Sequence, residues 1–202
     1  MCISTTYHMI KIAIFASGSG TNAENIIHYF STHHRIEVAL IVSNNPNAYV
    51  LHRALQAKVP TAICTKDELT NTQSVLQLLK EYEINWIVLA GFLLKIPDYL
   101  ISTFPNRIIN IHPALLPKFG GKGMYGSHVH QAVVAAGEKE SRISIHYVNS
   151  HYDAGDIIFQ ATCPVKSSDT LDDVAAKIHL LEQAHLPSVI EQLILSTTPT
   201  KQ

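Results

Sequence analysis

Short apolar runs alternate with longer helical stretches along the first half of the chain. Five of the runs have the length and the β-branched content of buried strands, at residues 12–16, 37–42, 61–64, 86–90 and 107–111. Helices are predicted between them at about 22–30, 48–57 and 73–82. This alternation predicts right-handed βαβ units and a parallel sheet. Because the strands are apolar almost throughout, we expect helices on both faces of the sheet.

The pattern changes after residue 112. A loop rich in Pro and Gly occupies 113–126, a helix is predicted at 128–136, and two strand-like segments at 142–148 and 157–165 flank a polar loop. A last helix is predicted at about 171–195, with a kink or break at Pro187. The expected fold is therefore a single α/β domain with a Rossmann-like, mostly parallel twisted sheet.

Length and cysteine content indicate one domain in a reducing compartment. The chain has 202 residues, enough for one full-size domain with a buried core. Cys2, Cys64 and Cys163 are scattered and form no CxxC pair, which predicts a cytoplasmic protein without a disulfide framework. The start of the chain is polar and has no basic n-region, so a signal peptide is not expected. Residues 1–9 are predicted to be an unstructured extension. No apolar run is long enough to span a bilayer.

Charge and histidine content narrow the expected partners. The net charge is −1 with His neutral, and no block of Lys and Arg is present, so we expect small-molecule substrates rather than nucleic acid or a membrane. The twelve histidines raise the possibility of a metal site. However, the pair His128 and His130 falls in a predicted helix, where residues two apart do not share a face. No HExxH motif or Cys/His cluster accompanies it, and we predict no metal.

A buried strand with two polar residues at its end is the first candidate site. The stretch RIINIHPALLP (107–117) is apolar up to Asn110 and His112, and Pro113 ends it. Residues two apart on a strand point to the same face, so both side chains should lie together at the carboxyl edge of the sheet. Ligands bind at that edge in open α/β sheets. The alternative is a capping Asn and an edge His without a chemical role.

A glycine loop after the first strand is the second candidate site. Gly18-Ser-Gly20-Thr-Asn-Ala23 fits the pattern GxGxxG/A, and Thr21 with Glu24 predicts a capping box. Backbone N–H groups and the helix dipole favour an anion there. A dinucleotide would require an acid after the second strand, which instead ends Val42-Ser43-Asn44-Asn45. A phosphate monoester is favoured over a nicotinamide cofactor, and a purely structural turn is the third alternative.

A polar loop in the second half supplies a candidate acid, Asp153. A carboxylate near His112 would favour its cationic form and orient it. An imidazolium beside an Asn carboxamide would give two donors for an oxyanion of acyl transfer. GxSxG is absent, so the substrate would bring its own nucleophile. The alternative for Asp153 is an Asx-turn. Ser144 and His146 share a strand face and could line the same cleft or face solvent.

Six motifs together carry a family resemblance. They are SGSGTN (17–22), VLAGF (88–92), NIHPALLPK (110–118), HVHQAV (128–133), SIHYV (144–148) and DAGDIIFQ (153–160). Over about residues 10–195 the chain resembles the phosphoribosylglycinamide formyltransferases, the folate-dependent transformylases of purine synthesis. The resemblance implies one formyltransferase domain at 10–196, with a nucleotide-binding half at 10–110 and a folate and catalytic half at 111–196. An extension (1–9) and a tail (197–202) would flank it.

The resemblance also implies a reaction and its residues. The amine of glycinamide ribonucleotide would attack the formyl carbon of the co-substrate 10-formyltetrahydrofolate, without a metal. Asn110 and His112 would hold the oxyanion, His112 would also transfer protons, and Asp153 would raise the pKa of His112 and relay protons through water. The other implied residues are Gly20, Thr21 and Asn22 for the phosphate, Glu182 for the ribose, and Leu93, Leu94, Lys95, Ile96 and Asn110 for the folate. The apolar side chains among the folate residues could equally belong to the core. The expected assembly is a monomer or homodimer.

Three features depart from the family pattern. The loop KFGGKGMYGSH (118–128) is longer than the commonest form, although a subset of members shares it. Arg142 stands where Gly is usual, so the edge pairing of its strand is not carried over from the family. The folate-contacting Arg that some members have before the fourth strand has no counterpart here.

Other functions agree less well with the sequence. Formyltetrahydrofolate hydrolase resembles this domain with an added N-terminal domain, and methionyl-tRNA formyltransferase carries an added C-terminal barrel. We expect neither in a chain of 202 residues. A nicotinamide oxidoreductase would lack its acid after Val42. A non-catalytic nucleotide-binding module would leave Asn110, His112 and Asp153 without a role.

Overall fold

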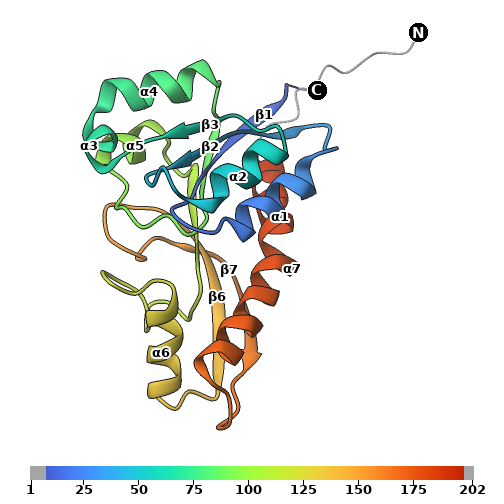
Figure 1. Cartoon of the computed structure of the whole chain (residues 1–202), viewed down its shortest axis with the longest axis vertical. Coiled ribbons are helices and arrows are strands. Elements are labelled where there is room, and N and C mark those ends of the chain that lie inside the picture. The colour runs from blue at the N-terminus through green and yellow to red at the C-terminus, as the bar shows by residue number, and fades with distance from the viewer. Residues whose placement is uncertain (1–7, 198–202) are drawn as a thin grey trace.

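A seven-stranded sheet forms the centre of the molecule (Figure 1). The structure, a computed structural model, describes residues 8–197. The strands are β1 (Ile10–Phe15), β2 (Ile36–Ser43), β3 (Thr61–Ile63), β4 (Trp86–Leu89), β5 (Ile108–His112), β6 (Glu140–Tyr147) and β7 (Ile157–Pro164). They lie in the order β3-β2-β1-β4-β5-β6-β7. Neighbouring strands from β3 to β5 pair in parallel, and β6 pairs antiparallel with both β5 and β7. The prediction of a mostly parallel α/β sheet is confirmed.

Helices cover both faces of this sheet, as predicted. The helices are α1 (Thr21–Phe30), α2 (Tyr49–Gln56), α3 (Lys66–Thr70), α4 (Thr72–Glu81), α5 (Asp98–Thr103), α6 (Ser127–Ala135) and α7 (Leu171–Thr197). Alternate residues of β1 belong to two separate buried clusters. Ile12 and Ile14 face the cluster that includes residues of α1, α2, α6 and α7, whereas Ala13 and Phe15 face the cluster that includes residues of α3, α4 and α5.

Two short helices, α3 and α5, were not predicted from the sequence. They have five and six residues, which is too short for a helical hydrophobic period to be recognised. For α3 a different signal was present. Thr65 and Glu68 form a reciprocal capping box at its start, and the spacing of these two residues is visible in the sequence.

The capping box predicted at Thr21 and Glu24 is not formed. Helix α1 begins after Gly20, which has φ 76° and ψ 25°, and no side chain caps the helix. The carboxylate of Glu24 instead forms an ion pair with Arg53 of α2. A contact between two helices has therefore replaced the local contact that the spacing suggested.

Helix α7 continues through Pro187, which rules out the break, one of the two predicted alternatives at this residue. The helix has 27 residues, and Pro187 is buried together with Leu186, Val189 and Ile190. Burial of apolar side chains on both sides of the proline holds the helix together where propensity alone would end it.

Helix α7 packs along α1. Polar contacts join these two helices, which lie near opposite ends of the sequence. Asn22 Nδ2 donates to Glu182 Oε2 at 3.0 Å, and Asn25 Nδ2 donates to the carbonyl of Gln183 at 2.9 Å. Further along, Tyr29 and His33 both contact Glu191. We refer to these contacts as the α1–α7 seam. In Figure 1 the blue and red helices lie side by side along it.

Arg142 does not disturb the sheet. It pairs with Thr162 in the β6–β7 register, and its guanidinium contacts Glu140 on the same strand. The irregularity in this pairing lies instead between Ile145 and His146. Residues 1–7 of the predicted extension and 198–202 of the predicted tail lie outside the described residues. Among residues 8–197, no helix is both long and apolar enough to cross a membrane.

Candidate active site

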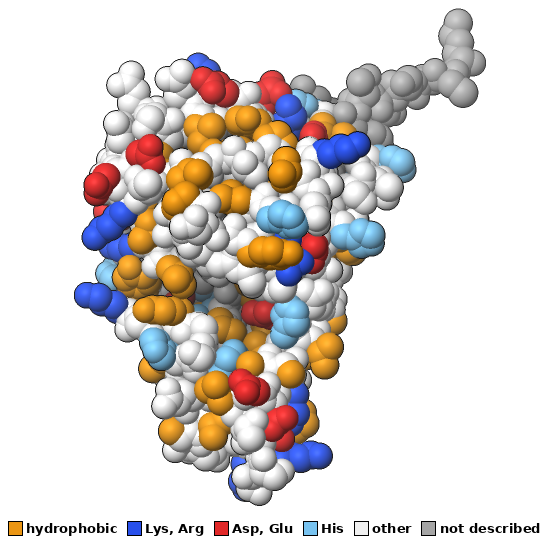
Figure 2. Space-filling model, in the orientation of Figure 1, with side chains coloured by type: hydrophobic (Ala, Val, Ile, Leu, Met, Phe, Trp, Pro, Cys, Tyr) orange, Lys and Arg blue, Asp and Glu red, His pale blue; other side chains and the backbone are white. Residues whose placement is uncertain are grey.

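A cavity of about 650 Å³ lies at the carboxyl ends of the parallel strands. Its walls are the glycine loop after β1, the segment after β4, the end of β5 and the loop at 121–126. The volume falls within the range of roughly 300–1,000 Å³ that suits a small-molecule ligand. Figure 2 shows the molecule hollowed near the middle of this view, with apolar and ionisable side chains around the hollow.

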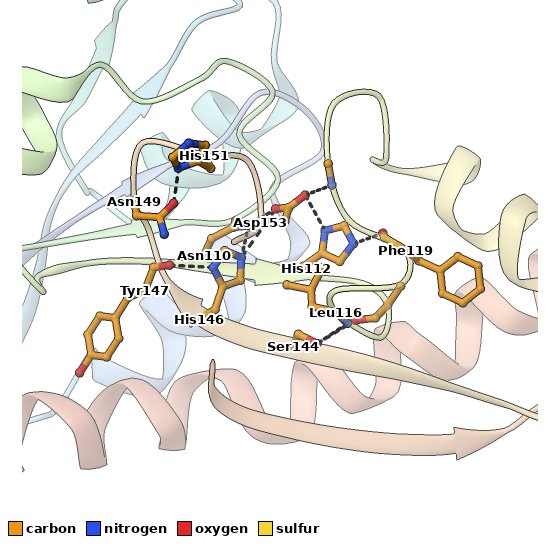
Figure 3. Close-up of polar contacts among 12 residues, drawn as sticks. Asn110, His112, Leu116, Phe119, Ser144, His146, Tyr147, Asn149, His151 and Asp153 are labelled. Atoms are coloured by element: carbon orange, nitrogen blue, oxygen red, sulfur yellow. Dashed lines mark hydrogen bonds and ion pairs between the residues drawn. The ribbon is translucent and has the colours of Figure 1, made fainter. Parts of the chain in front are cut away.

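Asn110 and His112 both line this cavity, as their spacing on β5 predicted. His112 is almost fully buried, with 3% of its surface exposed, and Asn110 is half-buried. The strand places both residues on one face, and Ile111 between them belongs to the core cluster on the α1 and α7 side. Figure 3 shows the two side chains with Asp153 between them.

Asp153 reaches the end of β5 from the loop between β6 and β7. Its Oδ2 accepts a hydrogen bond from Gly121 N at 2.9 Å and lies 3.7 Å from His112 Nδ1. Its Oδ1 lies 3.4 Å from Asn110 Nδ2. Asp153 has φ 52°, a left-handed conformation that Asp tolerates better than most residues. The sequence identified this residue, and the structure brings it to both members of the strand pair.

The loop that carries Asp153 is held closely against β6. A Cβ added at Gly155 would lie 1.8 Å from the carbonyl oxygen of Tyr147, so only glycine fits there. Tyr147 N also donates to the carbonyl of Asp156 at 2.9 Å. These backbone contacts fix where the carboxylate of Asp153 points.

The ring of His112 is oriented by two contacts. Nε2 lies 2.7 Å from the carbonyl oxygen of Phe119, and a carbonyl only accepts, so this nitrogen carries a proton. In the neutral imidazole, Nδ1 is then unprotonated and faces Asp153 Oδ2. A proton taken up at Nδ1 would convert it into a donor toward Asp153 or toward a ligand in the cavity.

Burial lowers the pKa of His112 from its ordinary value of 6.5. Asp153 and the Phe119 carbonyl act in the opposite direction, and His146 adds a smaller downward contribution. The sequence interpretation expected Asp153 to leave this pKa raised. Asp153 does raise it, but the cost of desolvating the imidazolium is larger, because the ring is almost completely removed from water.

Asp153 is held in its ionised form. Burial alone would raise its pKa, but the neighbouring His146 and His112 imidazoles and the Gly121 N–H together hold the pKa below the ordinary value of 3.8. The side chain is only 12% exposed, so these contacts act where water screens them little. A carboxylate in this state can stabilise a cationic imidazole beside it.

His146 belongs to this site, although the sequence left it open between cleft and solvent. Its Nδ1 lies 2.8 Å from the carbonyl oxygen of Tyr147 and therefore carries the proton. Its Nε2 then accepts from Asn110 Nδ2 at 3.1 Å. The other N–H of Asn110 makes only the long 3.4 Å contact to Asp153, which leaves it available to an incoming oxygen atom. Ser144, the other residue left open, is buried and bonds the loop at 114–116.

The glycine loop and α7 form the other end of the cavity. Gly20, Thr21, Asn22 and Glu182 all line it. Burial raises the pKa of Glu182, against the hydrogen bond from Asn22 and the nearby His179. The loop therefore places the first backbone N–H groups of α1, which have no acceptor within the helix, beside a largely buried carboxyl group.

The segment predicted to hold the folate lies between two cavities. Leu93 lines the large cavity, and Leu94, Lys95 and Ile96 line a smaller neighbouring cavity of about 70 Å³. Ser17 Oγ accepts from Leu93 N at 2.9 Å and donates to Asn44. Ser17 therefore connects the ends of β1 and β2 to this segment, as a part of the turn rather than as a nucleophile.

The comparison with known proteins agrees with this geometry. The family model described as formyl transferase matches residues 10–190. The chain belongs to the formyl transferase family. Among residues 8–197 of this family member, no group of three or more His, Cys, Asp or Glu could hold a metal ion.

Individual relatives carry the name phosphoribosylglycinamide formyltransferase. The Bacillus subtilis protein is 36% identical over 92% of this chain and 95% of its own length. The chloroplastic protein of Vigna unguiculata is 37% identical over 91% of this chain, but this chain spans only 60% of that protein. The crystal structure of the Streptococcus pneumoniae protein superposes with a TM-score of 0.81 at 34% identity, over 92% of this chain and 99% of its own.

Within this formyl transferase fold, Gly20 cannot be replaced without strain. A Cβ at Gly20 would lie 2.4 Å from Val50 Cγ2 and 2.8 Å from Val50 Cα, and the residue has φ 76°. Gly20→Ala is therefore expected to lower the free energy of unfolding by roughly 1–3 kcal/mol, as measured by urea denaturation. Gly18→Ala is the matched control, because no atom lies within 4 Å of its Cβ position. Equal stability of the two variants would contradict the expected clash.

Proposed function

We propose that the protein transfers a formyl group from 10-formyltetrahydrofolate to the amine of 5′-phosphoribosylglycinamide, giving formylglycinamide ribonucleotide and tetrahydrofolate. The observation that carries the proposal is the convergence of Asn110, His112 and Asp153 in a cavity that also includes Gly20 and Glu182. Membership of the formyl transferase family supports the reaction class. The names of the relatives support the acceptor. A cytoplasmic location and a monomer or homodimer stay predictions.

In the proposed mechanism, the amine attacks the formyl carbon and the formyl C=O becomes an oxyanion. The N–H of Asn110 that now makes the long contact to Asp153 would donate to this oxyanion. His112, once protonated at Nδ1, would be the second donor. Asn110 is a fixed donor that needs no reorganisation as negative charge develops, and the imidazolium formed by proton uptake adds a second donor to the tetrahedral intermediate.

Proton transfer uses the unprotonated Nδ1 of neutral His112. The attacking amine releases a proton, which His112 takes up directly or through water, and the carboxylate of Asp153 at 3.7 Å stabilises the resulting imidazolium. The proton then passes to the folate nitrogen N10 as the bond from N10 to the formyl carbon breaks. No proton is gained or lost by the enzyme over the cycle.

Substrate placement follows the two ends of the cavity. The backbone N–H groups at Gly20 to Asn22 and the dipole of α1 would bind the phosphate. Glu182 would accept from the ribose hydroxyls, and the backbone of residues 93–96 would hold the pterin. Asn110 lies between these two regions, since it lines both the large and the small cavity.

The first test is to measure tetrahydrofolate release from 10-formyltetrahydrofolate by the purified protein, with and without glycinamide ribonucleotide. Release is expected only with the ribonucleotide, and mass spectrometry of the acceptor should show one added formyl group. Release without the ribonucleotide would favour a hydrolase, with water as the acceptor. Absence of release in both reactions would exclude the proposed transferase.

A further inference from the structure

Lys122 is a cation in a cavity that is also lined by two acidic side chains. Of the described residues that line the large cavity, Lys122 is the single Lys or Arg, whereas Asp153 and Glu182 are acidic. No hydrogen bond or ion pair joins its side chain to another residue in the range 8–197. A lysine that faces a cavity in this way is available to a ligand.

Two other cations, one beside the glycine loop and one in the loop of Lys122, already have carboxylate partners. Arg53 contacts the glycine loop, since its Nε donates to the carbonyl of Ser19 at 2.9 Å. The same guanidinium forms an ion pair with Glu24. Lys118, in the same loop as Lys122, forms an ion pair with Glu138. The loop 118–127 therefore contains two lysines with different surroundings, one neutralised by a carboxylate and one facing the cavity.

The backbone around Lys122 is anchored to the active site. Gly121 and Gly123 flank it with φ 102° and 92°, conformations that favour glycine. The N–H of Gly121 donates to Asp153 Oδ2 at 2.9 Å. Lys122 thus follows directly after a residue fixed to the carboxylate of the site, and its flexible side chain extends from that fixed point.

We propose that Lys122 supplies the positive charge that neutralises the phosphate group of the acceptor, an inference that rests on the proposed function. A phosphate monoester carries a charge of about −1.5 to −2 at pH 7. The glycine loop offers it neutral N–H groups and a partial helix charge only. Glu182 stands in the same cavity and, in its ionised form, repels the phosphate. A lysine, which binds phosphate as a mobile point charge, offsets this repulsion.

The test compares wild-type protein with Lys122→Met. The variant is expected to raise the KM for glycinamide ribonucleotide about tenfold, which corresponds to the loss of one charge-assisted hydrogen bond. Its kcat should stay within about threefold, and the KM for the non-phosphorylated glycinamide riboside should not change, because the riboside has no phosphate to lose contact with. Lys122→Arg should restore most of the affinity. Lys118→Met is the matched control and should behave as the wild type.

A second measurement does not depend on formyl transfer. Calorimetric titration with ribose 5-phosphate should show binding that is weakened in Lys122→Met and less sensitive to salt than in the wild type. This arm tests Lys122 even when no transfer to the ribonucleotide is detected. Equal affinity of the wild type and the variant, or no binding of ribose 5-phosphate by the wild type, would overturn the inference. So would a rise in KM for the folate donor alone, which would assign the charge to the other substrate.

Discussion

Replacing Asp153 with Asn is expected to lower kcat by about 10²–10⁴-fold and to leave both KM values near those of the wild type. Asn has nearly the same shape and also tolerates the left-handed backbone at this position, where φ is 52°. Its neutral amide cannot stabilise a cationic His112 at 3.7 Å as a carboxylate does. The change therefore removes charge from the proposed proton pathway with little effect on the shape of the cavity.

The neighbouring carboxylate provides the control for this variant. Asp156 lies in the same loop and is exposed, and its backbone carbonyl, not its side chain, holds Tyr147 N. Asp156→Asn should keep wild-type kcat. Steady-state kinetics with glycinamide ribonucleotide and 10-formyltetrahydrofolate will separate the two carboxylates. Turnover by Asp153→Asn at the wild-type rate would remove Asp153 from the mechanism, and a raised KM with unchanged kcat would make it a binding residue.

His112→Asn is expected to lower kcat/KM by about 10²–10³-fold, the usual cost of losing one oxyanion donor. The pH profile gives a sharper criterion. Burial places the pKa of His112 below 6.5, so the wild-type kcat/KM should fall only as the pH drops through that lower value and Nδ1 becomes protonated. Asp153 does not contribute to this limb, because its pKa lies below 3.8. In His112→Asn the acid limb should disappear.

His128→Asn is the matched control for this variant, because His128 is exposed at the start of α6. It should retain both the rate and the acid limb. An acid limb that persists in His112→Asn would assign the titration to another group. The other buried histidine of the cavity is His130, whose pKa burial also lowers.

The parts of the site that depend on local periodicity were predictable from the sequence. Asn110 and His112 share a face because strand residues alternate, and this holds in any strand. The carboxyl edge of a parallel sheet then fixed where they point. The glycine loop was equally clear, since a turn from strand to helix requires residues that accept positive φ, as Gly20 does at 76°.

The parts of the site that depend on distant contacts were not predictable. His146 contacts Asn110 only because β6 runs antiparallel to β5 and pairs these two residues directly. The sign of the His112 pKa shift depends on how completely the surrounding chain buries the ring, which no single segment determines. The absent cap at Thr21 has the same origin, because its predicted partner Glu24 is taken by Arg53 from another helix. Family motifs indicated which groups we propose to react, but not the electrostatic state of those groups.

Because the proposed acceptor site lies on the α1–α7 seam, binding of the acceptor should stabilise the folded protein against unfolding. Asn22 and Glu182 are 160 positions apart, and a ribonucleotide bound as proposed would contact both. Such a ligand bridges the first and last helices and binds only when both are docked. By mass action it shifts the unfolding equilibrium toward the native state, by about 2.7 kcal/mol at a ligand concentration of 100 times Kd. Chains whose last helix has come away lose this stabilisation, so the metabolite favours the docked, complete fold.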